Sequence, residues 1–413
     1  MNILFIHGNF PAQFANIAPE MAKRLNAKVV FLTLAENDQK IQLPGVINVR
    51  FALHRSPGEQ THHYLQVFEE AVLKGQAVLR ALHGLSEKGF TPDVVICHGG
   101  MGFGLYIKAL LPNVKIVSYQ EWYFTHQNAT ALSSEPDINH TCRLETRNAP
   151  LLQEMVQADE IVCPTLWQSK QFPPEYRDRI RIIFDGVNRD FFKPALPQAL
   201  LSLKTESSDE PLNFDSDQLL LSYGTRGMEP LRGFPEFMRA AAAAQQAFPN
   251  LQVVIFGRDR NAYSFEHAQF GGSWREAMLD ELKNQLDLSR LHFTGLLSYL
   301  DLVRLFQRSD LHCYFTRPYV VSWGVFQAAA CGANLLVNEF DGLEEVFGGR
   351  PNNPTVNLED QESVTHGVLH GLEQRCQQKE ETMNQIPKST LNPDLELQRC
   401  LDQWEKLLKG MNC

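Results

Sequence analysis

Residues 2–14 read NILFIHGNFPAQF, a short apolar run that leads directly into a glycine and, three residues later, a proline. Short apolar runs bounded by turn-forming residues are typical of buried β-strands, whereas a membrane span needs about 20 apolar residues. The run also lacks the basic segment that begins a signal peptide. We therefore expect a strand at residues 3–7, then a loop, then a helix that has Pro11 in its first turn.

The same alternation of apolar runs with amphipathic stretches continues along the chain. Further runs occur at residues 28–33, 93–98, 115–120, 160–164 and 181–185, and later at 219–223, 252–256, 291–294, 311–315 and 334–338. Helical patterns occupy residues 11–25, 64–87, 147–158, 233–247, 274–286, 299–307, 323–331 and 395–408. Because buried strands separated by helices form parallel sheets covered on both faces, we predict an α/β fold.

Residues 194–218 interrupt the alternation with three prolines and a cluster of Ser, Thr, Asp and Glu. Such a composition is typical of an interdomain linker. We therefore predict a first domain at 1–193, a linker at 194–218, a second domain at 219–391, and a terminal helix within 392–413 that packs back on the first domain. Both domains are expected to be doubly wound, Rossmann-like units that face each other.

The composition limits the function. The chain has 413 residues, with 38 Lys and Arg against 48 Asp and Glu, so its formal net charge is −10. Such a charge argues against binding nucleic acid as a polymer. The eight cysteines are dispersed without a CxxC spacing, which favours thiols in a reducing compartment over disulfides or a zinc site. We expect a soluble cytoplasmic protein.

Several common motifs are absent from the sequence. No GxGxxG follows the first strand, and neither a GxxxxGK[ST] loop nor a GxSxG elbow occurs, which argues against dinucleotide, nucleoside-triphosphate and serine-hydrolase sites. A DxD occurs once, at Asp215–Asp217, but it lies in the expected linker, where solvated charges are the simpler explanation. We therefore expect no cofactor and no metal.

Polar residues gather where the predicted strands of the first domain end, which is where ligands bind in such sheets. Gly8, Asn9 and Phe10 follow the first strand, and Glu121 follows another. His98 ends a strand and precedes glycines at 99, 100, 102 and 104, which are expected to open space beside it. A histidine there acts as a base or orients a hydroxyl, although an isolated histidine is more often structural.

In the second domain, two arginines six residues apart bracket a turn before a predicted helix. Arg226 and Arg232 are accompanied by glycines at 224, 227 and 233. Arginine forks match phosphate oxygens, and a helix N-terminus adds backbone donors. The alternative is a pair of solvated surface arginines. A similar site is expected at the helix capped by Ser322, where the N–H groups of Trp323 and Gly324 face the loop.

Together these stretches resemble the retaining glycosyltransferases of family 4, in particular a bacterial subgroup. The resemblance spans residues 1–350 and is carried by residues 2–25 (NILFIHGNFPAQFANIAPEMAKRL), 147–150 (RNAP), 164–169 (PTLWQS), 184–187 (FDGV), 226–234 (RGMEPLRGF) and 317–332 (RPYVVSWGVFQAAACG). It implies a GT-B fold with a C-terminal crossover helix. It also implies a nucleoside-diphosphate-sugar donor on the second domain and the acceptor on the first.

The resemblance also implies roles for single residues. Arg226 and Arg232 match the basic pair on the donor diphosphate, although the second is more often lysine. His98 matches the histidine near the transferred sugar, and these three residues are expected to carry catalysis. The other donor-side residues are Gly8, Arg258, Leu297, Tyr319, Ser322, Trp323, Gly324 and Gln327, and the acceptor-side residues are Asn9, Phe10 and Glu121.

One departure from the family concerns two glutamates eight residues apart, near the donor sugar and the ribose. Their positions hold Tyr319 and Gln327. An amide makes weaker hydrogen bonds to ribose than a carboxylate does, so we expect weakened donor binding.

The leading hypothesis is a metal-independent, retaining transferase that moves a hexose from a donor such as UDP-glucose to a glycan or lipid-linked acceptor in polysaccharide biosynthesis. The alternatives are a catalytically weakened nucleotide-sugar-binding partner in a glycan assembly complex, and another GT-B chemistry such as nucleotide-sugar epimerisation. The sugar, the base, the acceptor, the oligomeric state and a peripheral contact with the inner face of the membrane stay open.

Overall fold

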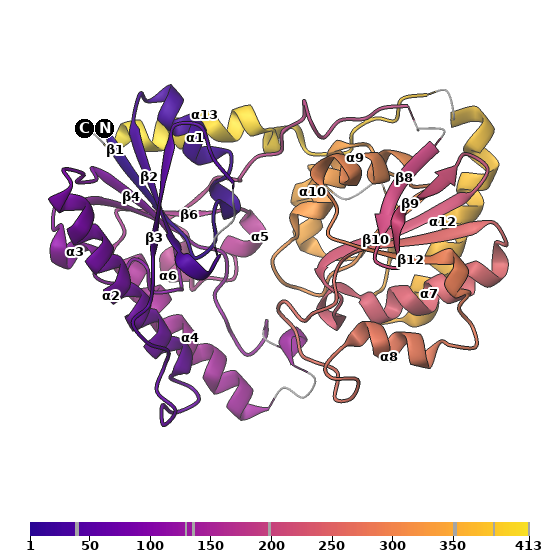
Figure 1. Ribbon diagram of the computed structural model, residues 1–413, viewed down its shortest axis with the longest axis horizontal. Coiled ribbons are helices and arrows are strands. Elements are labelled where there is room, and N and C mark those ends of the chain that lie inside the picture. The colour runs from indigo at the N-terminus through magenta and orange to yellow at the C-terminus, as the bar shows by residue number, and fades with distance from the viewer. Residues whose placement is uncertain are drawn as a thin grey trace. The chain divides into compact units, whose positions relative to one another are not determined.

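The computed structural model describes residues 1–37, 41–128, 130–133, 137–196, 200–349, 353–382 and 385–411 (Figure 1). The chain forms two compact units. The first consists of Met1–Thr130, Glu135–Gly186 and Asp394–Cys413, and the second of Ala131–Ser134 and Val187–Pro393. The C-terminal segment therefore belongs to the N-terminal unit.

The N-terminal unit is built on a parallel sheet. Among the described residues this sheet has seven strands in the order β3-β2-β1-β4-β5-β6-β7. The strands are β1 (Asn2–Ile6), β2 (Lys28–Leu34), β3 (Val46–Phe51), β4 (Val94–His98), β5 (Lys115–Tyr119), β6 (Glu160–Cys163) and β7 (Ile180–Ile182). Along β1, β2 and β4, apolar side chains that point to either face of the sheet are buried, because helices cover both faces.

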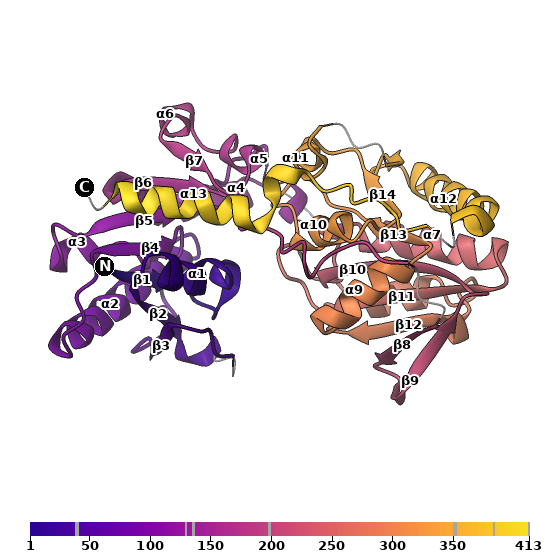
Figure 2. The same ribbon diagram turned by 90° about the horizontal axis from the view of Figure 1, so that it is seen from above.

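The helices of this unit divide between the two faces of the sheet (Figure 2). One face carries α2 (Gln66–Glu87) and α4 (Ile138–Gln157), and the other carries α1 (Ile17–Arg24) and α13 (Leu397–Gly410). Trp404 of α13 is fully buried and stacks on Tyr119 with ring centroids 6.5 Å apart. Shorter elements are α3 (Ile107–Leu110), α5 (Leu166–Ser169), α6 (Pro174–Arg177), η1 (Ala12–Phe14), η2 (Ala35–Asn37) and η3 (Thr130–Leu132).

The sequence predicted that the first helix begins at Pro11, and this prediction is wrong. A 3-10 turn occupies Ala12–Phe14, and α1 begins only at Ile17. Ala12 has a φ of +47°, outside the helical region, so a helix cannot run through it. The turn directs the Phe14 ring into the core, where its centroid lies 5.2 Å from that of Phe5.

The C-terminal unit repeats this architecture. Its described residues form a six-stranded sheet in the order β12-β11-β10-β13-β14-β15, also parallel. The strands are β10 (Leu219–Gly227), β11 (Leu251–Arg258), β12 (Leu291–Gly295), β13 (Leu311–Tyr314), β14 (Leu335–Asn338) and β15 (Thr355–Val356). The helices and turns are α7 (Phe234–Ala247), α8 (Trp274–Glu281), α9 (Tyr299–Arg308), α10 (Trp323–Ala330), α11 (Glu344–Phe347), α12 (Gln361–Thr382), η4 (Pro230–Arg232), η5 (Leu288–Arg290) and η6 (Asp341–Leu343). The turn η7 (Pro393–Leu395) includes the point in the chain where the C-terminal unit ends and the last segment of the N-terminal unit begins.

The predicted linker at 194–218 is wrong over most of its length. Residues 200–215 form an antiparallel hairpin, β8 (Leu200–Thr205) and β9 (Ser208–Asp215), that belongs to the C-terminal unit. Leu201 and Leu203 alternate with exposed residues and pack with Phe214 against the sheet and Leu305 of α9. This period of two marks a strand. The cluster of polar residues is therefore the exposed side and turn of a hairpin.

Candidate functional site

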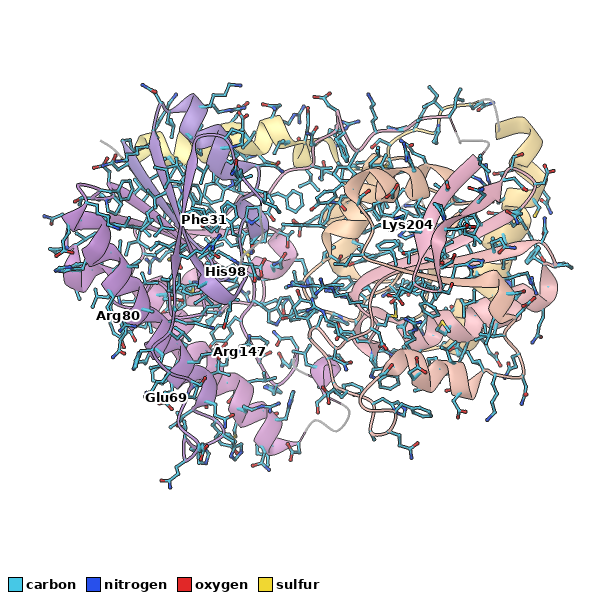
Figure 3. All side chains as sticks on the ribbon, viewed as in Figure 1. Phe31, Glu69, Arg80, His98, Arg147 and Lys204 are labelled. Carbon is cyan, nitrogen blue, oxygen red and sulfur yellow. The ribbon has the colours of Figure 1, made fainter. Side chains whose placement is uncertain are left out.

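Two histidines end adjacent strands of the N-terminal sheet. His7 directly follows β1, and His98, which Figure 3 labels, ends β4. Their rings meet edge to face with centroids 4.8 Å apart. Both are buried. Nδ1 of His7 lies 2.8 Å from the backbone nitrogen of Asn9 and 3.0 Å from the backbone oxygen of the same residue, so the tautomer of the ring decides which of the two contacts is a hydrogen bond.

His98 is paired with a carboxylate from the next strand end. Its Nε2 lies 3.2 Å from Oε2 of Glu121, and Gln13 donates to the other Glu121 oxygen at 3.0 Å. Nδ1 of His98 is buried and has no hydrogen-bond partner among the described residues. The structure thus brings together His98 and Glu121, which the sequence singled out separately.

The sequence predicted that the glycines after His98 open space beside it. In the structure they instead permit close packing. A Cβ at Gly99 would lie 2.1 Å from the Gln120 side chain. Gly102 has a φ of +87°, and a Cβ there would lie 2.1 Å from the backbone oxygen of Ala71 in α2. Two of the four glycines are therefore required by neighbouring atoms of the protein itself.

The backbone donors of this loop are directed at a side chain that the sequence did not reveal. Glu154 of α4 is buried, and its carboxylate accepts hydrogen bonds from the N–H groups of Gly100 and Gly104. Burial raises the pKa of Glu154 to about 7, although the backbone donors and the nearby His98 oppose the rise. A charged residue among Leu151 and Met155, on the apolar stripe of a helix, is the signal that could have identified it.

The first loop differs in part from its expected role. Phe10, predicted on the acceptor side, is 1 % exposed, and its ring packs edge to face on Phe31 at 4.9 Å. This correction follows from the inward turn of residues 10–14, which makes Phe10 part of the core. Asn9 is half-buried beside His7. The Gly8 oxygen accepts from Leu34 N–H and the Thr33 hydroxyl, and a Cβ at Gly8 would meet only ordinary contacts.

In the C-terminal unit, Arg226 and Arg232 share one aromatic ring. Arg226 donates to the Tyr263 hydroxyl at 2.9 Å, and the two guanidinium carbons lie 5.8 and 5.7 Å from the centroid of that ring. Arg232 is buried and donates to the Thr316 hydroxyl at 2.6 Å, whereas Arg226 is exposed. The two arginines are thus not a pair of solvated side chains, and they lie at the carboxyl ends of β10 and β13.

The segment that carries Tyr263 is held by a second buried carboxylate. One oxygen of Glu229 accepts hydrogen bonds from the backbone N–H groups of Ala262, Tyr263 and Ser264, at 2.9, 3.0 and 2.9 Å. Glu229 itself is fully buried. Because it lies between Arg226 and Arg232 in the chain, it links their turn directly to the loop of Tyr263. No local sequence signal marks either residue.

Further positive charge surrounds this cluster. Arg258 ends β11 and is exposed, and its backbone pairs with Gly227 of β10. Burial lowers the pKa of the neighbouring Arg260, and the charges of Arg226 and Arg258 lower it further. Three guanidinium groups that repel one another at strand ends make an environment that favours an anion.

The other donor-side residues lie around α10 and after β12. Ser322 caps α10 by accepting from Gly324 N–H at 3.3 Å, and its own N–H donates to the Tyr314 hydroxyl. Tyr319 is buried with its ring 5.4 Å from Tyr263, whereas Trp323 is exposed. The Gln327 side chain is half-buried on α10. The half-buried Leu297 side chain packs against the apolar cluster of the β8–β9 hairpin.

The described residues contain no cluster of three or more His, Cys, Asp or Glu that could hold a metal ion. The DxD motif forms part of a turn, because Oδ1 of Asp215 accepts from the N–H groups of Asp217 and Gln218. Among the described helices, none is long and apolar enough to cross a membrane.

With this geometry established, comparisons with known proteins identify the family. Residues 25–192 match the model of the glycosyl transferase family 4 group, and residues 232–390 match that of a glycosyl transferase-like domain. The chain is a glycosyltransferase, and its N-terminal part matches the family 4 group. No curated protein matches its sequence significantly.

Solved structures share the fold of this glycosyltransferase at low sequence identity. A sucrose-phosphate synthase from Thermosynechococcus elongatus is 14% identical with a TM-score of 0.68, covering 100% of this chain and 99% of its own. Anabaena HepE in complex with UDP and glucose is 13% identical with a TM-score of 0.66, over 99% and 100%. A glycosyltransferase from Rickettsia africae is 12% identical with a TM-score of 0.63, over 100% and 98%. The two Rossmann-like units are thus those of the GT-B fold.

Proposed function

We propose that this glycosyltransferase moves a hexose from a nucleoside-diphosphate sugar to a saccharide acceptor, with retention of the anomeric configuration and without a metal ion. The observation that carries the proposal is the pair of guanidinium groups, Arg226 and Arg232, that share the Tyr263 ring at the carboxyl end of the C-terminal sheet. Guanidinium forks bind phosphate oxygens in a bidentate manner, so this pair fits a diphosphate.

In the proposed step, the bond between the sugar C1 and the β-phosphate oxygen breaks, and the diphosphate gains negative charge. Arg232 acts on that charge from a buried position, where an electrostatic interaction is stronger than in water. The acceptor hydroxyl attacks the oxocarbenium-like sugar from the face that the diphosphate leaves, and its proton passes to a donor phosphate oxygen. No protein nucleophile takes part.

UDP-glucose is the donor to test first, because a protein of the same fold, Anabaena HepE, has been solved with UDP and glucose. On the acceptor side, the pair of His98 and Glu121 offers a buried imidazole nitrogen to a sugar hydroxyl. We propose a glycan or a lipid-linked saccharide of polysaccharide biosynthesis as the acceptor.

A second candidate is a nucleotide-sugar-binding partner with little activity of its own. It is motivated by Tyr319, whose buried ring stands against Tyr263 where the family has a glutamate, and by the neutral Gln327. Tight UDP binding without turnover on any acceptor would support this candidate over the transferase.

The test is turnover of a panel of nucleotide sugars by the wild type and by Arg226→Ala, Arg232→Ala and Arg239→Ala. Removing either arginine of the proposed site is expected to lower turnover at least about 100-fold. Arg239, a half-buried arginine of α7 paired with Glu281, is the matched control and should change turnover less than about twofold. Wild-type turnover in both site variants would refute the diphosphate site. A product with inverted anomeric configuration would refute retention. Loss of activity on chelation would refute metal independence.

A further inference from the structure

The N-terminal unit contains a buried carboxylate that the proposed transfer step does not use. Glu154 is 2 % exposed, and its two oxygens accept hydrogen bonds from Gly100 N–H at 2.5 Å and Gly104 N–H at 2.8 Å. Both donors belong to the loop that follows His98. A single side chain of α4 therefore fixes this loop at two points.

The loop and the His98 side chain are mechanically connected. Gly99 N–H donates to the backbone carbonyl oxygen of Tyr119 at 2.7 Å, which fixes the chain directly after His98. The next fixed points are the two hydrogen bonds to Glu154, while on the ring side His98 is held by Glu121. The direction of the unpartnered His98 Nδ1 thus depends on both carboxylates. Glu121 contacts the ring, whereas Glu154 holds the backbone of the loop and interacts with the ring only through its charge.

We propose that Glu154 is a positioning residue for sugar transfer, whose ionised carboxylate holds the loop at residues 99–104 in the conformation that presents His98 to its ligand. The inference rests on the proposed function, because it assumes that His98 meets the sugar or the acceptor. Glu154 touches neither; it acts through the loop.

The chemistry of this contact makes the loop sensitive to pH. An ionised carboxylate accepts at both oxygens, whereas a protonated one turns one oxygen into a donor, which cannot accept from a glycine N–H. One of the two hydrogen bonds is therefore lost on protonation. Because burial raises the pKa of Glu154 to about 7, this change falls in the neutral range.

Few other charged groups face this carboxylate. From β4 come His98, whose charge favours ionised Glu154, and the Cys97 thiol. From α2, Lys74 lies over the Phe103 ring of the loop and is paired with Glu70. We expect turnover to fall as the pH falls through about 7. The pH profile of the wild type alone does not identify the group that titrates, so a variant of Glu154 is needed.

The experiment compares kcat/KM of the wild type and Glu154→Gln from about pH 5.5 to about pH 9, together with UDP affinity. The amide resembles the protonated carboxyl at every pH. We therefore expect a loss of about tenfold or more at the alkaline end, convergence with the wild type to within about twofold at the acidic end, and unchanged UDP affinity. The matched control is Asp159→Asn, which also changes a carboxylate that accepts a backbone N–H, that of Ile116, but at the opposite end of the sheet.

Other results would overturn the inference. If Glu154→Gln keeps wild-type turnover at alkaline pH, or if its pH profile of kcat/KM is parallel to that of the wild type, Glu154 is only structural. If the amide variant does not fold, Glu154→Asp decides, because it keeps a titratable group on a shorter side chain. A shifted midpoint with lowered turnover supports the role of Glu154, and an unshifted profile refutes it. Absence of turnover in the wild type with every nucleotide sugar would instead refute the proposed function.

Discussion

Nε2 of His98 lies 3.2 Å from the carboxylate of Glu121, which Gln13 holds from the other side. The pair joins the carboxyl ends of two neighbouring strands, β4 and β5, since Glu121 comes two residues after Tyr119, the last residue of β5. The carboxylate fixes the plane of the imidazole through Nε2, while the buried Nδ1 has no hydrogen-bond partner among the described residues. The His98–Glu121 pair is thus a polar centre at the carboxyl ends of the inner strands of the N-terminal sheet.

Glu121→Gln tests whether the charge of this pair matters for transfer. The amide retains the size of the side chain but weakens the hydrogen bond to His98, because a charge-assisted bond becomes a neutral one. We expect kcat to fall about tenfold and UDP affinity to stay within about twofold. The control is Glu160→Gln, a carboxylate of the same unit paired with Arg181. Equal losses in the two variants would show that the effect is not specific to His98.

Tyr263→Phe tests the hydroxyl that accepts from Arg226. The substitution retains the ring that both guanidinium groups approach and removes one hydrogen bond at a partly exposed site. We expect the Kd for UDP to rise about fivefold, measured by calorimetry, because Arg226 loses its preferred orientation. Tyr299→Phe, an exposed tyrosine of α9, is the control. An increase in affinity would mean that the hydroxyl competes with the diphosphate for Arg226.

The sequence was sufficient for the fully buried strands and for the residues at their ends. β1, β4 and β10 are continuous apolar runs because helices cover both faces of their sheets, so they could be predicted. β3 (VINVRF) is an edge strand with Ile47 half exposed, and its mixed pattern resembles a loop. The long helix α12 was not predicted, because it buries only a narrow stripe of Val364, Val368 and Leu372 and contains two glycines.

The site was predictable to the same extent. Arg226, Arg232, His98 and Glu121 are at strand ends or turns, where parallel sheets gather ligand-binding residues. Tyr263 and Glu154 act through contacts with residues tens of positions away in the chain, and no local pattern records such contacts. Phe10 was misassigned for the same reason, since only the packing of its ring on Phe31 shows that it belongs to the core.

Leu203→Ala tests whether the β8–β9 hairpin is an integral part of the C-terminal unit. Leu203 is 2 % exposed and belongs to the apolar cluster that joins the hairpin to the sheet and α9. Truncating a buried leucine costs about 2–5 kcal/mol of unfolding free energy. We expect a loss of this size in the unfolding transition of that unit, and less than about 0.5 kcal/mol for the exposed Leu200→Ala. Equal, small effects would mean that the hairpin is a loosely attached connection.

The buried Glu154 also makes a prediction about stability, independent of turnover. Burial raises its pKa from 4.5 to about 7, so the folded state binds the proton more tightly than the unfolded chain does. The stabilisation that the protonated form provides is complete below about pH 4.5 and is lost as the pH rises through about 7. Because one pKa unit corresponds to about 1.4 kcal/mol, the loss between about pH 5 and about pH 8 is of the order of 2–3 kcal/mol.

Glu154→Gln has no such proton to lose, so its unfolding free energy relative to the wild type should improve by about 2–3 kcal/mol over that pH range. The measurement is denaturant unfolding of both proteins at several pH values, followed in the transition of the N-terminal unit. A difference between the two proteins that does not change with pH would show that Glu154 is ionised at little cost. A variant that gains stability at alkaline pH while it loses turnover there would identify the ionised carboxylate as a group that serves the loop beside His98 at the expense of stability.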